Sequence, residues 1–556
     1  MRIVKKFAYL CHYERFSHLK YLRMKKLLCS GLFFWMVFAV WAADMRVNLY
    51  QPVVPVLTQH LVTPVLRIQV IKGCMESCKL ERMCCTLNGT TDRSDIEEVL
   101  LCEANEKGRM GKCLLTVSGV KRDAFPKQVV FADVARLQMD TTYFWIAVRL
   151  KEKVDLSHRI VVNCSCVETS VGRADIAYSR PLVPLRVGVA VRRHGQDGVH
   201  TSRIPGIVTS ESGTLMAIYD ARYEGSRDLQ GHIDIAMNRS VDGGQTWLPM
   251  QVVLDRKEWG GLPEKYNGVS DACILKNDQN GDIYVAGLWM HGVLNGQTGK
   301  WVEHLTADST RWIHQWIAKG SQPGVDVKQT CQFLITKSSD DGRTWSTPVN
   351  ITAQTKRPEW WLFAPAPGHG ITLRDGTLVF PTQGRDENGH PFSNITWSKD
   401  GGKTWTASSP AYHNTTECMA VELADGGIML NMRDNRNHGH RENNGRRICV
   451  TYDLGQTWKE HVTSRKALIE PTCMASLHRH RYKKGKSILL FCNPESYNSR
   501  DHMTLKISCD DGMTWPTEKK ILLDEYGGFG YSCITSVRPS VVGVLYESSQ
   551  AQIVGQ

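Results

Sequence analysis

The chain lacks the features that mark several large classes of protein. After residue 43 it has no block of five or more like charges, so its formal net charge of +12 only weakly suggests nucleic-acid binding. Eight Lys and Arg against one Glu give residues 1–43 a charge of +7, which leaves +5 for the rest. An apolar content of 42% and a mean hydropathy of −0.30 exclude a disordered, collagenous or multi-span membrane chain. The 556 residues can bury a sizeable core.

Residues 1–43 have the order of a secretory signal. Two lysines precede an apolar run over 27–41, and two alanines follow it. This order is typical of a cleaved signal peptide that starts at Met24, and the run is short for a bilayer span. A membrane anchor with a short cytoplasmic segment is the alternative. We expect an exported protein, periplasmic, cell-surface or extracellular, with no stable membrane insertion once the signal is removed.

Sixteen of the 18 cysteines lie beyond this segment, where export would permit disulfides. No CxxC motif faces a matching second one, so the spacing does not indicate a zinc site. We expect neither a metal nor an organic cofactor. Three close pairs could still form disulfides or bind a metal: Cys74 and Cys78, Cys84 and Cys85, and Cys164 and Cys166.

An eight-residue pattern, S-x-D-x-G-x-T-W, recurs in the second part of the chain. In each copy the Asp side chain can accept from backbone N–H groups that follow it, and the Gly permits a positive φ, so each copy predicts a hairpin turn. A calcium loop would need further oxygen ligands and a closing Glu, which are absent. The spacing indicates one unit per copy, with an insertion of about 40 residues in the first interval. The copies begin at Ser240, Ser338, Ser398 and Ser508, with a variant at Thr451.

A turn followed by a short apolar segment forms a second repeat, with six copies that begin near residues 213, 281, 376, 427, 485 and 540. Such runs bounded by turn residues predict buried strands, and six repeated sheets favour closure into a ring. The sequence therefore predicts an all-β fold in which 186–556 form a six-bladed β-propeller with an insertion at about 291–330.

The ends of these repeated strands are rich in arginine. If the strands nearest the axis all finish on one face, the residues that follow them gather around a central cleft. Four arginines in one pocket would call for an anion, although any single one could instead be paired on a blade rim. The residues concerned are Arg222, Trp289, Arg385, Arg433 and the segment 495–500, which ends at Arg500.

The repeats resemble those of a known family. The S-x-D-x-G-x-T-W turns resemble the Asp boxes of sialidases, and Arg203-Ile204-Pro205 resembles the motif that opens their propeller. The stretch from about 186 to 548 is similar to bacterial exo-sialidases, most of all to secreted Bacteroidetes enzymes, and GFGYSCITSV followed by GVLYESSQA is particularly similar. Asp boxes also occur in non-catalytic propellers, so the catalytic set is the more specific sign.

The resemblance implies roles for seven residues of this sequence. Taken singly, each could be a core aromatic, a partner of a rim arginine or a solvated loop residue, but the ordered set favours catalysis. The implied roles are carboxylate binding by Arg203, Arg433 and Arg500, acid and base catalysis by Asp228, nucleophilic attack by Tyr531 with activation by Glu417, and a further substrate contact from Arg222.

A tyrosine nucleophile has a physical rationale. Sialic acid carries a carboxylate on its anomeric carbon, which would repel an Asp or Glu nucleophile in a partly desolvated site. A phenol avoids this repulsion, but with an ordinary pKa of about 10 it needs a carboxylate to take its proton and cations to stabilise the phenolate. The acid that protonates the leaving oxygen needs a raised pKa and hence a shielded position.

We therefore expect a retaining exo-α-sialidase that hydrolyses terminal sialic acid from glycoproteins, glycolipids and oligosaccharides. A trans-sialidase, including the intramolecular form that yields an anhydro sugar, would share these residues and differ in how well the aglycone face excludes water. A sialic-acid-binding lectin would keep the arginines without needing Asp228 or Tyr531. The expected partners are sialylated glycoconjugates and not nucleic acid, and no oligomeric state is predicted.

Residues 44–185 lack Asp boxes and carry alternating segments such as VLRIQVI and YFWIAVRL, which predict an antiparallel β-sandwich. GTTDRSDIEEV resembles the module that precedes Bacteroidetes sialidase propellers, which implies carbohydrate binding or substrate presentation. A purely structural support is the alternative. A P-L-V-P-L linker marks the boundary near 181–186.

The expected insertion contains Trp301, Trp312 and Trp316. Such a segment could form a rim near the cleft, where aromatic faces hold the aglycone sugar or a lid excludes water. An internally packed loop is the alternative, and Trp360 and Trp361 allow the same two interpretations.

Overall fold

The computed structural model describes residues 45–549 except 73–77, 120–124, 138, 229–230, 260–263, 265–266, 292–320, 322 and 328–329. The signal-like segment with Met24 and most of the insertion expected at 291–330, with its three tryptophans, lie outside the described residues. No helix of the described part is long and apolar enough to cross a membrane. Strands dominate this part, which confirms the all-β prediction.

Two sheets of the N-terminal part pack on one shared core, as a sandwich requires. The strand order is β12-β1-β3-β8-β5-β6 in one sheet and β11-β10-β4-β7 in the other, and only β1 with β12 is parallel in these two sheets. The strands are β1 (Arg46–Tyr50), β2 (Val56–Leu57), β3 (Val62–Ile71), β4 (Cys78–Thr86), β5 (Ile96–Ala104), β6 (Met110–Ser118), β7 (Gln128–Leu137), β8 (Thr141–Leu150), β9 (Arg159–Ile160), β10 (Asn163–Thr169), β11 (Gly172–Arg173), β12 (Asp175–Tyr178) and β13 (Leu185–Gly188).

Alternation along these strands explains the shared core. In β7 the side chains of Val129, Phe131 and Val134 are buried while several of their neighbours are exposed, and they meet Val47 and Ile68 of the other sheet in one apolar cluster. Disulfides join Cys84 to Cys166 and Cys102 to Cys113.

The described residues from 201 to 546 form six further sheets, mostly antiparallel meanders. Their strands are β14 (Thr201–Thr209), β15 (Leu215–Arg222), β16 (Ile233–Ser240), β17 (Gln251–Leu254), β18 (Asn267–Lys276), β19 (Ile283–His291), β20 (Gln332–Ser338), β21 (Val349–Asn350), β22 (Leu362–Pro365), β23 (Gly368–His369), β24 (Ile371–Thr372), β25 (Leu378–Arg385), β26 (Pro391–Ser398), β27 (Thr406–Ala407), β28 (Tyr412–His413), β29 (Thr415–Glu422), β30 (Ile428–Asp434), β31 (Arg447–Thr451), β32 (Lys459–Glu460), β33 (Ser476–Lys483), β34 (Lys486–Pro494), β35 (Met503–Ser508), β36 (Lys520–Asp524), β37 (Ser532–Arg538) and β38 (Val541–Tyr546).

Helices are short in the described part of the chain. They are α1 (Thr352–Thr355) and the 3-10 helices η1 (Arg93–Asp95), η2 (Gln196–Gly198), η4 (Asn435–Asn437) and η5 (Thr517–Lys519).

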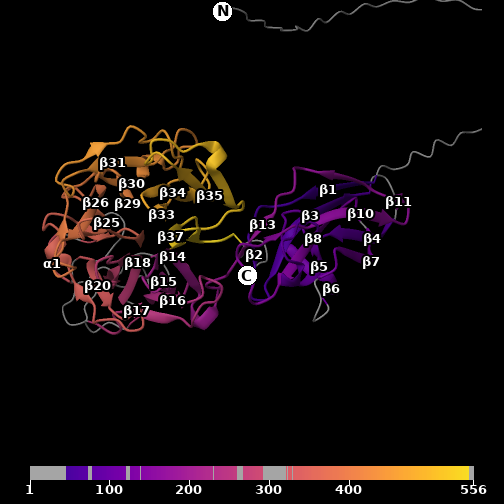
Figure 1. Ribbon diagram of the computed structural model, residues 1–556, viewed down its shortest axis with the longest axis horizontal. Coiled ribbons are helices and arrows are strands. Elements are labelled where there is room, and N and C mark those ends of the chain that lie inside the picture. The colour runs from indigo at the N-terminus through magenta and orange to yellow at the C-terminus, as the bar shows by residue number, and fades with distance from the viewer. Residues whose placement is uncertain are drawn as a thin grey trace, which may run out of the picture. The chain divides into compact units, whose positions relative to one another are not determined.

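The six sheets are arranged as a β-propeller. The strands β14, β18, β29, β33 and β37, each the first of its sheet in the chain, contact the first strand of a neighbouring sheet. In Figure 1 these strands lie toward the middle of this part, whereas β17, β20, β31 and β35 lie toward its outside. The last sheet has two described strands and residues 550–556 are not described, so the count of six blades stays a prediction.

The repeated apolar segments are strands, but they are not the ones nearest the axis. They form β15, β19, β25, β30, β34 and β38, and each pairs with the strand that precedes it. The expectation that innermost strands carry the repeat was therefore wrong, because a fully buried second strand has the same continuous apolar pattern as an innermost one. Since neighbouring strands are antiparallel, the ends of the second strands lie beside the starts of the first strands.

The Asp boxes are hairpin turns between the third and fourth strands of their sheets. In the box at Ser398, Asp400 accepts from the backbone N–H of Lys403 (3.0 Å) and Thr404 (2.9 Å) and from the Thr404 hydroxyl (2.6 Å), and Gly402 has φ +82°. In the variant at Thr451, Asp453 accepts from the backbone N–H and the hydroxyl of Thr457 and from the Thr451 hydroxyl. These bonds satisfy the turn's own donors, so they confirm the predicted turn.

Replacing Asp400 with Ala is expected to lower the free energy of unfolding at pH 7 by roughly 1 kcal/mol, because exposed turn donors return to water. The Thr404 hydroxyl and the backbone N–H groups lower the pKa of Asp400 from 3.8 to about 2. The ionised Asp400 side chain therefore makes its full contribution to the free energy of unfolding above pH 3.8, and this contribution is lost as pH falls through about 2. Denaturant unfolding of both proteins from pH 7 downward checks this, and equal midpoints at pH 7 would contradict it.

Candidate active site

One cluster of charged side chains comes from two kinds of strand end in the propeller sheets. These are the starts of the first strand and the ends of the second strand of a sheet. Arg203 lies near the start of β14 and Glu417 near the start of β29, and Tyr531 directly precedes β37. Arg222 and Arg433 come from the ends of β15 and β30. Antiparallel pairing brings both kinds of strand end to the same face, which is why residues far apart in the sequence meet here.

Tyr531 lies between a carboxylate and three guanidinium groups. Its hydroxyl donates to Glu417 Oε1 in a short hydrogen bond. Arg433 donates from Nη1 to Glu417 Oε2 (2.6 Å) and to the Tyr531 hydroxyl (3.3 Å). The guanidinium carbons of Arg203 and Arg500 lie 5.1 and 5.7 Å from the centre of the Tyr531 ring. The three arginines expected to bind a carboxylate therefore surround the expected nucleophile.

Glu547, just after β38, connects Arg203 to Tyr531. It accepts from Arg203 Nε (2.9 Å) and from the backbone N–H groups of Ile204 (3.1 Å) and Tyr531 (2.9 Å). Its side chain and that of Arg203 are both buried. A buried carboxylate with three donors fixes the direction of the arginine and the start of the strand that carries the tyrosine.

Arg500 contacts backbone carbonyl groups, and no acid among the described residues pairs with it. It donates to the carbonyl oxygens of Phe529 (2.9 Å) and Thr472 (3.3 Å). Phe529 itself is exposed, and the centre of its ring lies 4.4 Å from the guanidinium carbon of Arg203. The positive charge of Arg500 is therefore available to an anion.

Asp228 lies on the loop between β15 and β16 and faces two arginines. Its Oδ1 accepts from Arg222 Nη1 (2.5 Å) and from Arg203 Nη1 (3.3 Å). Arg222 is buried and also donates to Asp220 (3.0 Å). The expectation that Asp228 lies in a shielded position was wrong, because its side chain is 64% exposed.

Burial governs the protonation of two groups in this cluster. It raises the pKa of Tyr531 well above 10, and Glu417 adds to that rise while Arg433 and Arg500 oppose it. It also raises the pKa of Asp271 well above 3.8, with further contributions from Asp220 and Glu417. The Tyr531 phenol is therefore protonated at rest, and Glu417 is the carboxylate partner for its proton.

Two residues expected at the cleft are not part of this cluster. Trp289 is buried in an apolar core and packs edge-on against Trp259, with ring centres 4.6 Å apart. Arg385 donates to the carbonyl of Gly389 in its own loop (3.4 Å). The expectation failed because the side chains of a strand point alternately to its two faces, so a position near a strand end does not fix where a side chain points. Trp360 is also a core residue.

The sequence interpretation missed Asp220, Asp271 and Glu547. Asp220 and Asp271 are acidic residues inside the buried strands β15 and β18, and a lone carboxylate in an apolar run is a usable signal. Asp271 also has φ +57°, which no sequence pattern indicated. Glu547 lies in GVLYESSQA, a stretch whose resemblance to sialidases does not single out this acid.

Family models match most of the chain. Residues 213–544 match the BNR repeat-like domain, and residues 44–172 match the N-terminal domain of BNR-repeat neuraminidase. The sialidase of Bacteroides fragilis (strain YCH46) is 41% identical over 433 residues, which are 77% of this chain and 75% of that protein. The sialidase of Micromonospora viridifaciens is 31% identical over 369 residues, which are 64% of this chain and 51% of that protein.

A solved structure is similar over nearly the whole chain. It is the Hadza microbial sialidase Hz136, with a TM-score of 0.80 and 35% sequence identity. The match covers 90% of this chain and 97% of that one. The similarity therefore includes the N-terminal sandwich as well as the propeller.

Proposed function

Because the chain belongs to the BNR-repeat sialidase family and is a glycoside hydrolase, we propose that it is a retaining exo-α-sialidase with Tyr531 as its nucleophile. The hydrogen bond from the Tyr531 hydroxyl to Glu417, with Arg433 contacting both, is the observation that carries the proposal. A neutral phenol can approach an anomeric carbon that bears a carboxylate, and Glu417 can take its proton.

The substrate carboxylate would bind to Arg203, Arg433 and Arg500. These guanidinium groups lie around the Tyr531 ring and stay charged at any physiological pH. Planar guanidinium groups match a carboxylate well, so three of them can hold the sugar with its anomeric carbon near the phenol oxygen. They also favour the phenolate, which offsets the raised pKa of Tyr531.

The reaction would take two displacements. In the first, Glu417 takes the phenol proton, the Tyr531 oxygen bonds to the anomeric carbon, and Asp228 protonates the departing glycosidic oxygen. In the second, Asp228 takes a proton from water, the water oxygen bonds to the anomeric carbon, and the released phenolate recovers its proton from Glu417. Each displacement inverts the anomeric centre, so the net result is retention. Bound substrate would cover the exposed Asp228.

Release of free sialic acid from a fluorogenic α-sialoside by residues 44–556 tests the proposal. Proton NMR of the first-formed anomer should show the α form, and the β form would contradict retention. Product mass spectrometry separates hydrolysis from transfer or from an anhydro sugar. Binding of sialyllactose without turnover would instead support the lectin alternative.

Glu547→Gln is expected to raise KM for the sialoside by about tenfold, because Arg203 loses a charged partner that fixes its direction. Steady-state kinetics with a fluorogenic sialoside measure this. Glu460→Gln is the matched control, since it removes an ion pair with Arg447 (2.5 Å) away from Tyr531 and should leave KM unchanged. Equal KM values for Glu547→Gln and wild type would contradict the positioning role.

We also propose that the protein is exported and acts on sialylated glycoconjugates outside the cytoplasm. The signal-like order of residues 1–43 supports this, as do the two disulfides of the N-terminal part. Fractionation of cells that express the full chain tests it, and an uncleaved protein in the cytoplasmic fraction would contradict it.

A further inference from the structure

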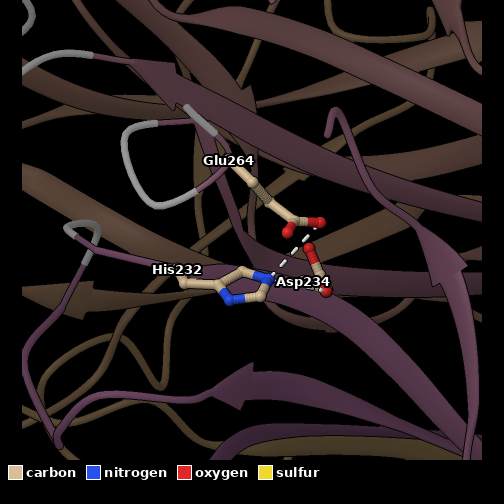
Figure 2. Close-up of side chains that lie close together, drawn as sticks. All are labelled: His232, Asp234 and Glu264. Atoms are coloured by element: carbon tan, nitrogen blue, oxygen red, sulfur yellow. Dashed lines mark ion pairs between the residues drawn. The ribbon is translucent and has the colours of Figure 1, made fainter. Parts of the chain in front are cut away.

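Three side chains outside the catalytic cluster converge on one point (Figure 2). His232 directly precedes β16, Asp234 lies within β16, and Glu264 lies between β17 and β18. The Nε2 atom of His232 is 3.5 Å from Asp234 Oδ2 and 3.5 Å from Glu264 Oε1. One ligand atom from each of the three residues lies within 4.8 Å of the other two. Figure 2 shows the imidazole directed toward both carboxylates.

The Nε2 atom of His232 is a buried polar atom that satisfies no hydrogen bond. Both of its carboxylate neighbours are at ion-pair distance, beyond the usual 2.7–3.2 Å of an N–H···O bond. Nε2 therefore faces two carboxylate oxygens at a separation that leaves room for a small ion. An ion between the three side chains would contact all of them.

The imidazole of His232 packs against Tyr223. The Tyr223 and His232 rings stack with centres 4.0 Å apart. Asp234 is buried, whereas His232 and Glu264 are 25% and 41% exposed. The arrangement is therefore rigid on its inner side and open to solvent on its outer side, as an ion site with an entry path would be.

The surroundings of the cluster are negatively charged. Asp255 is a third carboxylate near Asp234. Three carboxylates around one imidazole favour a cation between these groups.

We propose that His232, Asp234 and Glu264 bind a divalent transition-metal ion, with Zn²⁺ as the best fit. Tetrahedral Zn²⁺ with bonds of about 2.0–2.2 Å separates its ligand atoms by roughly 3.4 Å. Both measured separations from Nε2 are 3.5 Å, and the ligand atoms of the two carboxylates lie within 4.8 Å of each other, so the Glu264 side chain could complete the site by a small movement. One imidazole nitrogen and two carboxylate oxygens suit Zn²⁺ better than the all-oxygen ions Ca²⁺ and Mg²⁺.

The sequence did not indicate this site. The expectation of no metal rested on the cysteine spacing, the missing oxygen ligands of the Asp-box turns and the resemblance to sialidases. The three ligands follow no recognisable metal motif, because His232 and Asp234 are two residues apart and Glu264 comes 30 positions after Asp234. The ion would have a structural role, since Tyr531 and Glu417 belong to a different cluster.

The site would secure the loop that carries Asp228. The backbone N–H of Tyr223 donates to the carbonyl of His232 (3.1 Å), which closes the base of the loop from 223 to 232. Arg222 Nη1 donates to Ser226 (2.8 Å) and to Asp228 from the same base. An ion bound to His232 would hold the C-terminal end of this loop. This consequence for Asp228 rests on the proposed function, whereas the metal site itself does not.

Zinc titration of chelator-treated full chain by isothermal calorimetry tests the proposal. We expect one Zn²⁺ per chain and an affinity at least about tenfold weaker in His232→Ala, since one of three ligands is lost. Glu264→Gln should weaken binding in the same way without touching a buried group. The matched control is His60→Ala, which removes an exposed imidazole hydrogen-bonded to one carboxylate, Glu97 (2.6 Å), and should bind like wild type.

Thermal unfolding gives a second readout. Saturating Zn²⁺ should raise the melting temperature of wild type and of His60→Ala, but not that of His232→Ala, because only a ligand that binds the folded state stabilises it. The proposal is overturned if wild type binds no Zn²⁺, or if His232→Ala and Glu264→Gln bind it as tightly as wild type does.

The inactive variant Tyr531→Phe separates the metal site from the proposed function. It keeps all three ligands and should bind Zn²⁺ with wild-type affinity. Loss of sialidase activity in that variant with zinc binding intact supports both proposals. Zinc binding by an enzyme without sialidase activity would contradict the function alone.

Discussion

Replacing Tyr531 with Phe is expected to lower kcat/KM for an α-sialoside by at least about a thousandfold, because the substitution removes only the oxygen that forms the covalent bond. The ring would stay in place between Arg203 and Arg500. Binding of sialic acid should therefore be largely kept, so the loss should appear in kcat rather than in the dissociation constant of the product. Steady-state kinetics together with calorimetry of sialic acid measure the two quantities.

Tyr219→Phe is the matched control for this variant. Tyr219 is also buried in the propeller, but its hydroxyl donates to Asn238 (2.6 Å), which is a structural contact. This control should lose roughly 1 kcal/mol in the free energy of unfolding and keep its activity. If Tyr531→Phe kept more than about a tenth of wild-type activity, another residue would have to be the nucleophile.

Asp228→Ala is expected to lower kcat/KM for sialyllactose by about 10²–10⁴-fold, the usual contribution of a general acid. The loss should be much smaller for a sialoside with an acidic phenol as leaving group, because such a group departs without protonation. Comparison of the two substrates under the same conditions measures the difference.

The leaving-group dependence is what distinguishes acid catalysis from damage to the site. Asp228 also pairs with Arg203 and Arg222, so its removal could disturb substrate binding. Such a disturbance would affect both substrates alike and would contradict the assigned role. Asp278→Asn, which breaks an exposed pair with Lys276 (2.8 Å), is a control that should leave both rates unchanged.

The fold could be predicted from the sequence wherever short local patterns determine it. Each Asp box contains both the acceptor and the donors of its turn, so the hairpins at Asp400 and Asp453 follow from eight residues each. Continuous apolar runs located the buried strands. They did not locate the axis, because burial on both faces looks the same in an inner strand and in its neighbour.

The candidate site was predictable only in part. Resemblance to a family pointed to Arg203, Arg433, Arg500, Glu417 and Tyr531, which the structure brings together. The supporting acids were not found, because their role depends on contacts between distant segments. Local spacing could not connect Glu547 with Arg203, which are 344 positions apart, nor Asp271 with Gln383.

The contacts of Glu547 also determine when the cluster around Tyr531 can form during synthesis of the chain. Arg203 opens the propeller, while Tyr531 and Glu547 belong to its last described sheet. Until the ribosome has released the final strands, Arg203 lacks the carboxylate that fixes its direction and Tyr531 is not yet in place. A partly synthesised chain can therefore have folded blades while the cluster around Tyr531 is incomplete, and the cluster forms only when the first and last strands of the propeller have met.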